Sequence, residues 1–537
     1  MAYENPKDDF AIDGGGHGGA AAASAGAECA GCCRACDYRR AGDASIIFPA
    51  QTPLVRSHPA VTTSLHDERV AVVHDGGLAY PLVAPFDPPN PVYDAVLGLL
   101  ERLGLDAAQA RTPAWNPLGA LVGPGQHVVI KPNFVSSRNF HHRYAQDEFL
   151  CCCTHPSVIR PLIDLAWRAL DGHGTISIAE APLEGGQFEN TLAALGVTAM
   201  VETLRARDGV PLELIDLRDF QIVPRMLLDD VAVAGRSLNV GALERRPLPG
   251  DPRGYRTVDL GAASSFAGLD GRCDGLRFHH SNPGLPSLHH RDGRHEYSFG
   301  KTVLAADLLI SMPKMKSHKK TGVTLGLKNM IGTTNQKYWL PHFTAGAPPE
   351  GDEYPVTPPL GWRLQTFLSR MTLPGGHAAV VRFPPVDRRE DPFVYDGNWS
   401  GNDTLWRTIL DLNRILLHAD KNGELREDRQ RTLLTIIDGI VAGEGNGPLA
   451  PVPKRCGVLV GGLDPWACDW VTTRMMGVDP AAIGFLAEPA RAGRYAVTRV
   501  RPEDVEVVPR ELADLRFAFA LPVGWRTAAA AAGAPSR

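Results

Sequence analysis

The chain has 537 residues, of which 44% are hydrophobic and 21% are charged, a composition typical of a soluble globular protein. Its formal net charge of -5 at pH 7 gives no bulk electrostatic reason to expect a nucleic-acid partner. No run approaches the roughly 18 consecutive apolar residues that a membrane-spanning helix needs, and the N-terminus lacks a signal-peptide pattern, so the sequence predicts a cytoplasmic protein without a membrane span.

The two ends of the sequence differ in composition from the part between them. Residues 1–45 are rich in Gly and Ala, and residues 527–537 are rich in Ala, so both are predicted to be flexible tails. Residues 46–526 are long enough to bury a sizeable core and are predicted to form a single large domain.

The N-terminal tail contains a cluster of cysteines. Four thiols lie within eight residues and could hold zinc or an iron–sulfur cluster, although their spacing is not that of a ferredoxin. Ten cysteines in 537 residues are too sparse for a disulfide scaffold, which favours thiol or metal chemistry. The candidate metal ligands are Cys29, Cys32, Cys33 and Cys36.

Apolar runs of strand length alternate with helical patterns through the domain. This alternation predicts an α/β fold with a largely parallel sheet, helices on both faces and long loop insertions. The insertions are expected at about residues 235–296, where Gly, Pro and His are frequent, and at about residues 333–399.

The first two clear strands each deliver a polar residue to their carboxyl end. Residues 127–134 form a buried strand pattern that leaves Lys131 and Asn133 near its end. Residues 175–179 form the next strand and lead directly to Glu180. These side chains are therefore candidates for a site at one edge of the sheet.

A third strand runs into the most basic segment of the chain. The apolar run at residues 306–312 is predicted to stop at Pro313, and a basic loop is expected to follow. Lysines can hold phosphate or carboxylate as point charges, and His318 can act as an acid or base because its reference pKa lies near neutrality. We interpret this segment as an anion site rather than a solvated loop. Its basic residues are Lys314, Lys316, His318, Lys319, Lys320 and, further on, Lys328.

Two carboxylates follow a fourth strand at residues 433–437. Asp438 comes at its end, and Glu444 lies in a Gly-rich segment at residues 443–448 that lacks the Lys-Ser/Thr ending of a P-loop. Asp438 and Glu444 could hold a divalent cation or divide acid and base duties, and a purely structural turn is the alternative.

Because the carboxyl ends of parallel strands meet at one edge of a sheet, these side chains are expected to converge. The alternative is that they are polar only because strand ends meet water. The candidate catalytic residues are His318, Asp438 and Glu444, and the candidate anion-binding residues are Lys131, Asn133, Lys314, Lys316, Lys328, Asn329 and Asn446.

Other histidines and cysteines favour structural interpretations. The pairs His279-His280 and His289-His290, with His295, fit no zinc pattern and are more typical of exposed loops. Cys151-Cys152-Cys153 precede a helix predicted from Thr154-His155-Pro156 to about Leu170. A reactive thiol is possible there, but burial as small apolar residues is the favoured interpretation.

Several separate motifs occur together in one order along the chain. They are Val129-Ile130-Lys131-Pro132-Asn133, Thr154-His155-Pro156, Pro313-Lys314-Met315-Lys316-Ser317-His318, Gly322-Val323-Thr324-Leu325, Leu327-Lys328-Asn329, Asp438-Gly439-Ile440 and Gly445-Asn446-Gly447-Pro448. This set resembles the domain-of-unknown-function 362 family of bacteria and archaea, with a family core at about residues 127–480. The resemblance implies an α/β domain. Some relatives are joined to ferredoxin-type iron–sulfur modules, whose regular Cys spacing this sequence lacks.

A narrower subgroup, whose genes lie near polysaccharide or natural-product genes, is similar at three further motifs. These are Trp339-Leu340-Pro341-His342, Gly351-Asp352-Glu353-Tyr354-Pro355 and Gly401-Asn402-Asp403-Thr404-Leu405-Trp406-Arg407.

The leading hypothesis is an enzyme acting on a phosphorylated or carboxylated small molecule in polysaccharide or secondary-metabolite biosynthesis, by acid/base or divalent-metal-assisted chemistry. The first alternative is an iron–sulfur or other metal-binding redox protein that uses the N-terminal cysteines. The second is a non-catalytic binding module.

Overall fold

A computed structural model describes most of the predicted domain. The described residues are 65–141, 149–183, 185–233, 236–279, 282–283, 285–356, 372–373, 377–378, 395–488 and 493–525, and the side chains of residues 224–243, 279, 282–283, 372–373 and 377–378 are left out. Both predicted tails lie outside these ranges, and so do Cys29, Cys32, Cys33 and Cys36.

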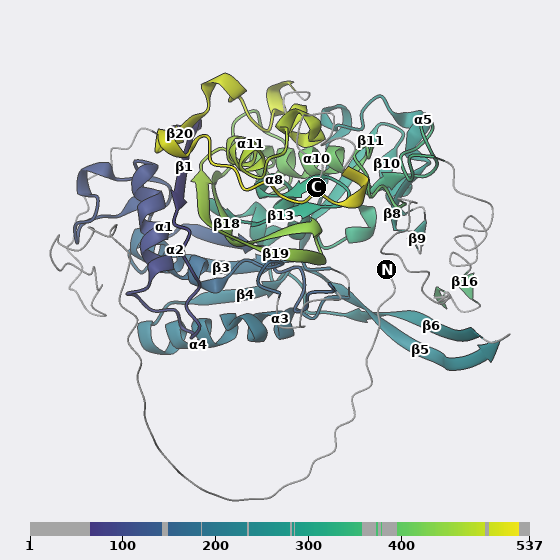
Figure 1. Cartoon of the computed structure of the whole chain (residues 1–537), viewed down its shortest axis with the longest axis horizontal. Coiled ribbons are helices and arrows are strands. Elements are labelled where there is room, and N and C mark those ends of the chain that lie inside the picture. Colours follow the sequence, from purple (N-terminus) through teal and green to yellow (C-terminus); the bar gives the residue numbers. More distant parts are fainter. Residues whose placement is uncertain are drawn as a thin grey trace, which may run out of the picture. The chain divides into compact units, whose positions relative to one another are not determined.

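A ten-stranded sheet forms the centre of the described structure, in the order β20-β1-β19-β18-β12-β2-β3-β4, with β13 branching from β18 and β14 pairing with β13 (Figure 1). The strands are β1 (Arg69–His74), β2 (His127–Pro132), β3 (Thr175–Glu180), β4 (Leu212–Asp216), β12 (Leu308–Met312), β13 (Lys314–His318), β14 (Gly322–Thr324), β18 (Thr432–Asn446), β19 (Ala450–Gly462) and β20 (Glu506–Val508).

The centre of this sheet is parallel. β12 pairs in parallel with β2 on one side and with β18 on the other, and β2, β3 and β4 continue the parallel run. Beyond β18, the parallel arrangement is interrupted by β19, which runs antiparallel to both β18 and β1. The predicted α/β fold with a largely parallel sheet is therefore confirmed.

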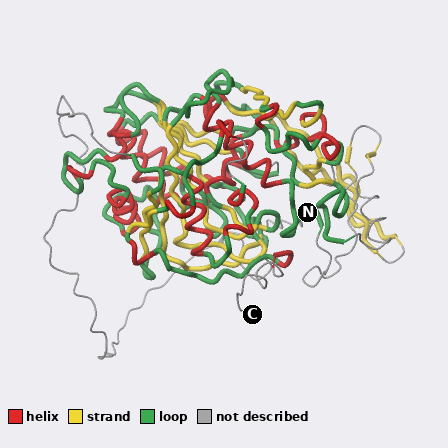
Figure 2. Tube along the Cα trace, turned by 90° about the horizontal axis from the view of Figure 1, so that it is seen from above, coloured by secondary structure: helices red, strands yellow, loops and turns green. Residues whose placement is uncertain are grey.

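Helices cover both faces of the sheet, and each face has its own core. Along β12, Leu308, Ile310 and Met312 pack into one core and Leu309 packs into the other, as the alternation of side chains along a strand requires. Figure 2 shows helices beside the strands in the view turned by 90°. The first core includes α1 (Pro91–Arg102), α2 (Pro156–Ala169), α3 (Phe188–Leu195) and α4 (Val197–Asp208), and the second includes α10 (Leu405–His418), α11 (Pro465–Met475) and α12 (Gly484–Ala487).

Helix α2 begins close to where the sequence predicts. His155 is the N-cap residue and accepts a hydrogen bond from the Ser157 amide, while Pro156 occupies the first helical position. Thr154, the predicted cap, instead donates its hydroxyl to the Met312 carbonyl at 2.5 Å. This contact fastens the start of α2 to the end of β12.

Two segments that the sequence presents as loops are strands. The third strand ends at Met312, just before Pro313, as predicted, but the chain continues after Pro313 as a new strand, β13, whose five residues are all buried. The fourth strand continues past Asp438 to Asn446 as β18, because β19 pairs with it along this length. The expected basic loop and Gly-rich loop are thus parts of the sheet.

The predicted insertions contain small sheets of their own. One consists of β7 (Tyr255–Asp259), β10 (His290–Arg291) and β11 (Arg294–Gly300), and another of β8 (Leu276–His279), β9 (Asn282–Pro283) and β15 (Phe343–Thr344). The hairpin of β5 (Phe220–Val233) and β6 (Arg236–Pro247) projects beside them (Figure 1). The remaining elements are α5 (Asp270–Cys273), α6 (Leu285–His289), α7 (Lys301–Leu304), α8 (Gly326–Asn329), β16 (Thr372–Leu373) and β17 (His377–Ala378).

Candidate functional site

The carboxyl ends of β2, β3 and β12 and the adjoining parts of β13 and β18 bring several of the predicted residues together. Lys314 pairs in register with Asp438, and Lys316 pairs with Gly443. Cross-strand hydrogen bonds then connect β13 to β2 and β2 to β3. Two kinds of lysine environment result, one with carboxylate partners and one without.

Lys131 and Glu180 form a buried ion pair between β2 and β3. The Lys131 ammonium lies 2.7 Å from the Glu180 carboxylate and also donates to the Asn329 amide oxygen at 3.3 Å. Gly332 allows this close packing, because a Cβ there would lie 2.0 Å from the Glu180 carboxylate. Burial lowers the pKa of Lys131, and the Glu180 charge opposes that change. Lys131 and Asn329 thus hold the sheet edge together.

Lys314 and Asp438 form a second buried pair, between β13 and β18. The Lys314 ammonium lies 2.6 Å from the Asp438 carboxylate and donates to the Tyr80 hydroxyl at 2.8 Å. Asp438 also accepts from the Tyr80 hydroxyl at 2.6 Å and from the His155 amide at 2.9 Å. Tyr80 stacks on His155, with ring centroids 4.0 Å apart, and its pKa is raised well above 10 by burial and by Asp438. The pair is fully satisfied within the protein.

Lys316 is equally buried but has neutral partners. Its ammonium donates to the Asn133 amide oxygen at 2.6 Å and to the Cys152 carbonyl at 2.5 Å. In the described part of the chain, no carboxylate forms an ion pair with it. Burial lowers its pKa, the neighbouring thiols of Cys152, Cys153 and Cys151 oppose that change, and the charge of Lys314 adds to it. Among the described residues, Lys316 therefore lacks the carboxylate partner that Lys131 and Lys314 have.

Lys328 lies on α8, which is fixed by its neighbours. The Gly326 and Leu327 amides donate to the Asp469 carboxylate at 2.7 and 2.8 Å, and Asn413 donates to the Leu327 carbonyl at 2.8 Å. The partly buried Lys328 ammonium forms no hydrogen bond or ion pair with any described residue. Its pKa falls to about 7, first through desolvation and then through the positive charges of Lys316, Lys337 and Lys320.

Two histidines beside these lysines have opposite tautomers. The Lys320 amide donates to Nδ1 of His318 at 3.1 Å, so the neutral His318 ring carries its proton on Nε2. Nδ1 of His342 lies 2.9 Å from the Leu340 carbonyl, which only accepts, so the neutral His342 ring has its lone pair on Nε2. Desolvation lowers both pKa values well below 6.5, helped by Lys328 at His318 and by Lys320 at His342.

Lys320 and Lys337 complete the group. Lys320 donates to the Asp396 carbonyl and lies over the Phe343 ring at 5.2 Å, and Lys337 donates to the Ile331 carbonyl. Desolvation lowers the pKa of Lys320, and Asp396 opposes that change. We call the following residues the basic cluster: Lys316, His318, Lys320, Lys328, Lys337 and His342.

His342 and Lys337 are absent from the candidates chosen from the sequence. His342 occurs in the motif Trp339-Leu340-Pro341-His342, which is similar to a family subgroup but follows no recognisable strand. Phe278 packs edge-on against its ring, at a centroid distance of 4.5 Å, and brings it to the cluster from the neighbouring small sheet. That tertiary contact has no signal in the local sequence.

Glu444 and Asn446 lie apart from the basic cluster's hydrogen bonds. Glu444 binds Lys454 of β19 at 2.9 Å and accepts from the Ala520 amide at 2.9 Å. Asn446 is exposed at the end of β18. Asp438 and Glu444 therefore have different lysine partners, so the two carboxylates are not joined in one bonding network.

The cysteines of the described residues are buried, and so are two of the histidines expected in exposed loops. Cys151, Cys152 and Cys153 are at most 1% exposed, which matches the favoured interpretation of small buried residues. The pKa of Cys151 is lowered by a hydrogen bond with Cys152 and by the nearby lysines. In contrast, the expected exposure of the loop histidines is wrong for His290 and His295, which face each other across β10 and β11 and are at most 1% exposed.

The described ranges contain no group of three or more His, Cys, Asp or Glu side chains that could hold a metal ion. The four N-terminal cysteines lie outside these ranges, so metal binding there stays a prediction.

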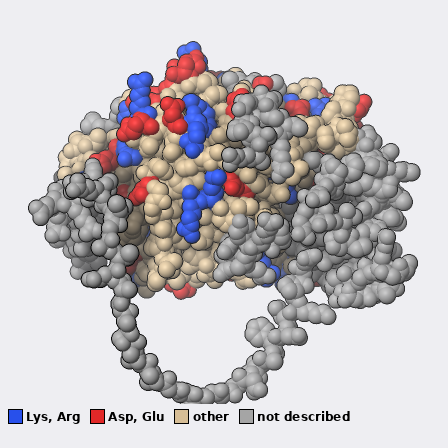
Figure 3. Space-filling model, in the orientation of Figure 1, with Lys and Arg blue, Asp and Glu red and all other residues tan. Residues whose placement is uncertain are grey.

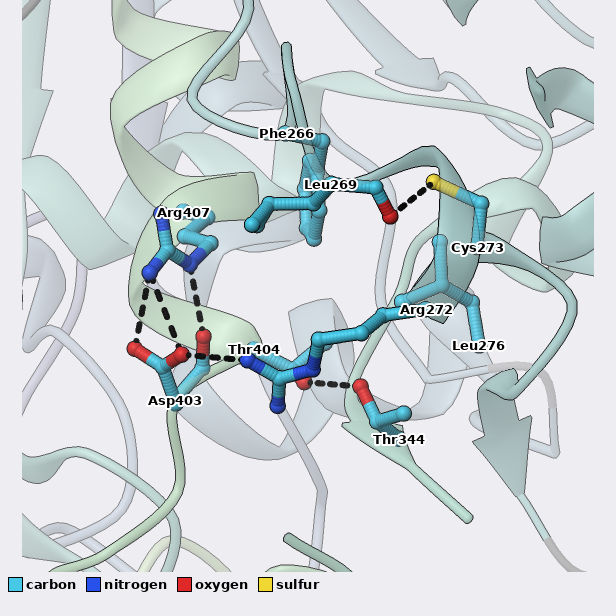
Figure 4. Close-up of a pocket in the computed structure, with 9 residues that line it drawn as sticks. All are labelled: Phe266, Leu269, Arg272, Cys273, Leu276, Thr344, Asp403, Thr404 and Arg407. Atoms are coloured by element: carbon cyan, nitrogen blue, oxygen red, sulfur yellow. Dashed lines mark hydrogen bonds and ion pairs between the residues drawn. The ribbon is translucent and has the colours of Figure 1, made fainter. Parts of the chain in front are cut away.

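A small pocket is lined by residues from several elements, among them Thr344 of β15 (Figure 4). It contains about 200 Å³ of empty space, part of it open to solvent, which is below the roughly 300 Å³ of small ligand sites. Asp403 neutralises its cations by binding Arg272 at 2.9 Å and Arg407 at 3.0 Å. The pocket therefore lacks the uncompensated charge of the basic cluster.

On the face in Figure 3, Lys and Arg side chains are interspersed with Asp and Glu. None of the helices in the described ranges combines the length and hydropathy needed to cross a membrane.

Comparison with known proteins places the basic cluster inside a family region. Residues 257–474 match the model described as "Domain of unknown function (DUF362)", which confirms the predicted resemblance for that part of the chain. A thylakoid-associated protein of Synechocystis sp. is 23% identical over 222 residues, which cover 39% of this chain and 47% of that protein. The match thus spans about half the length of this relative. No solved structure was found to match the chain.

Proposed function

We propose that this chain, whose residues 257–474 carry the DUF362 region, is an enzyme that binds a phosphorylated or carboxylated small molecule in the basic cluster. The proposal places substrate binding at Lys316 and Lys328, with Lys320 and Lys337 at the border of the site. It assigns proton movement to His318 and His342.

One observation carries the proposal: Lys316 is buried and Lys328 is partly buried, and neither forms an ion pair with a carboxylate among the described residues. Burying a charge costs free energy unless the charge is compensated. The same sheet edge compensates Lys131 and Lys314 with Glu180 and Asp438. An anionic ligand would supply the missing compensation at the basic cluster.

The histidines support a catalytic role in addition to binding. His318 presents an N–H group and His342 presents a lone pair, so one ring can donate a hydrogen bond while the other accepts a proton. Their lowered pKa values keep both rings neutral at pH 7. A polar group of an anionic substrate could be polarised by His318 and deprotonated by His342.

This assignment changes the roles expected from the sequence. Lys131, Lys314, Asn329 and Asp438 support the site through closed hydrogen-bond networks. Asn133 keeps a role in the proposed anion site, because its amide oxygen accepts a hydrogen bond from Lys316 and orients that side chain.

A thermal-unfolding screen tests the proposal. Phosphate, pyrophosphate, a sugar phosphate and citrate are added singly, because a ligand that binds only the native state raises the midpoint. At least one anion should stabilise the wild type, and K328M should remove most of that shift. K421M, which replaces an exposed lysine, is the matched control and should respond like the wild type. Equal responses of K328M and K421M would contradict the proposed site.

A further inference from the structure

Lys328 differs from every other lysine of the basic cluster in its bonding. Lys316, Lys320 and Lys337 each donate to an oxygen atom of the protein, whereas the Lys328 ammonium has no hydrogen-bond or ion-pair partner among the described residues. Binding an anion requires charge, but it does not require one amine to be left without a partner. An amine that no described side chain or carbonyl engages can act as a nucleophile in its neutral form.

We propose that Lys328 is a nucleophile that forms an imine with the carbonyl group of a phosphorylated or carboxylated aldehyde or ketone. This inference rests on the proposed anion site, and it narrows the substrate class to anions that also contain a carbonyl group.

The protonation state of Lys328 is consistent with this role. With a pKa of about 7, roughly half of its side chains carry a neutral amine at pH 7, whereas an exposed lysine is neutral in fewer than about one molecule in a thousand. An anion in the cluster would compensate the charges of Lys316, Lys320 and Lys337. It would not restore water to Lys328, and desolvation is the largest cause of the lowered pKa.

The two histidines can supply the proton transfers that imine formation needs. The Lys328 nitrogen attacks the carbonyl carbon, and the N–H of His318 donates a hydrogen bond to the carbonyl oxygen. Nε2 of His342 accepts each of the two amine protons in turn and passes it to that oxygen. The oxygen leaves as water, the C=N bond forms, and His342 ends neutral, so the step needs no oxidant or reductant.

Reductive trapping with glyoxylate tests the inference on the full-length protein. Glyoxylate is a small carboxylated aldehyde, and cyanoborohydride reduces its lysine imine to a stable carboxymethyl-lysine that peptide mass spectrometry can locate. At pH 7, Lys328 should be labelled at least ten times faster than the exposed Lys301 and Lys421. Pyrophosphate should protect Lys328, and the neutral propionaldehyde should show a smaller preference for it.

The pH profile separates a reactive amine from a merely accessible one. The rate at which Lys328 is labelled should stop increasing above about pH 7 to 8. The rate for exposed lysines should keep increasing up to about pH 10. K316M should slow labelling of Lys328 at pH 7, because loss of the Lys316 charge raises the pKa of Lys328. K421M should leave it unchanged.

The outcomes distinguish this inference from the proposed function. If pyrophosphate stabilises the protein through Lys328 but glyoxylate labels Lys328 no faster than Lys421, the imine is wrong and the anion site stands. If Lys328 is labelled rapidly but pyrophosphate neither protects it nor binds, the anion site is wrong and the proposed substrate class fails with it.

Discussion

Four lysines at one edge of the sheet form two contrasting regions. Lys131 and Lys314 have buried carboxylate partners at 2.7 and 2.6 Å, whereas Lys316 has neutral partners and Lys328 bonds to none of the residues that the structure describes. The residue type and the sheet edge are the same in both regions. What differs is whether the protein itself supplies the opposite charge, and that difference separates structural lysines from candidate ligand-binding lysines.

The contrast predicts opposite consequences of mutation. Removing one member of a compensated pair leaves a buried charge behind, so stability should fall. Removing an uncompensated lysine removes the free-energy cost of desolvating its charge. The free energy of unfolding should therefore stay the same or increase, while ligand binding is lost.

The largest expected effect is on the Lys314–Asp438 pair. D438N should lower the free energy of unfolding by about 3–5 kcal/mol, because Lys314 would remain buried without its carboxylate. Urea unfolding measures this change. If D438N costs less than about 1 kcal/mol, the pair does not stabilise the sheet edge in the way described.

The next effect is on the basic cluster. K328M should weaken binding of a stabilising anion at least tenfold, a loss of about 1.4 kcal/mol, while leaving the unfolding midpoint of the unliganded protein unchanged or raised. Titration calorimetry and urea unfolding give the two quantities. A variant that loses stability and binding together would place Lys328 among the structural lysines.

A smaller effect concerns pH. The folded pKa of Lys328 is about 7 and its unfolded value is near 10.5, so above pH 7 the unfolded chain holds more protons and stability rises with pH. Below pH 7 the lysine is charged in both the folded and the unfolded protein, so the destabilisation that its desolvated charge causes no longer changes with pH. Wild type should therefore gain on the order of 1 kcal/mol relative to K328M between pH 7 and 9.

Anion binding should have the opposite pH dependence, since the charged form of Lys328 binds the anion. Affinity for an anion should fall as pH rises from 7 to 9 in the wild type and much less in K328M. A parallel pH dependence in the two proteins would show that another group controls binding.

The smallest effect is expected at Glu444, which lies on the same strand as Asp438. Its pair with Lys454 is partly exposed, so E444Q should cost at most about 1 kcal/mol and should not change anion affinity. This variant is also the matched control for D438N. A large loss of activity in E444Q would restore the catalytic role that the sequence suggests for this residue.

The sequence predicts the fold better than it predicts the roles of individual residues. Alternating apolar runs indicate the parallel sheet, and polar residues at strand ends indicate the edge at which a site is expected. The extension of β18 through a Gly-rich segment has no local signal, because pairing with β19 determines it. The hydrogen-bond partner of each lysine has no local signal either. Nothing near Lys314 or Lys316 in the sequence shows that Lys314 binds Asp438 and Lys316 binds Asn133.

The central claim is that uncompensated charge at the basic cluster binds an anion. Titration calorimetry with pyrophosphate at pH 7, on wild type, K328M and K421M, tests it most directly. We predict that wild type and K421M bind with similar affinity and that K328M binds at least ten times more weakly. Absence of binding to the wild type, or equal binding to K328M, would contradict the account.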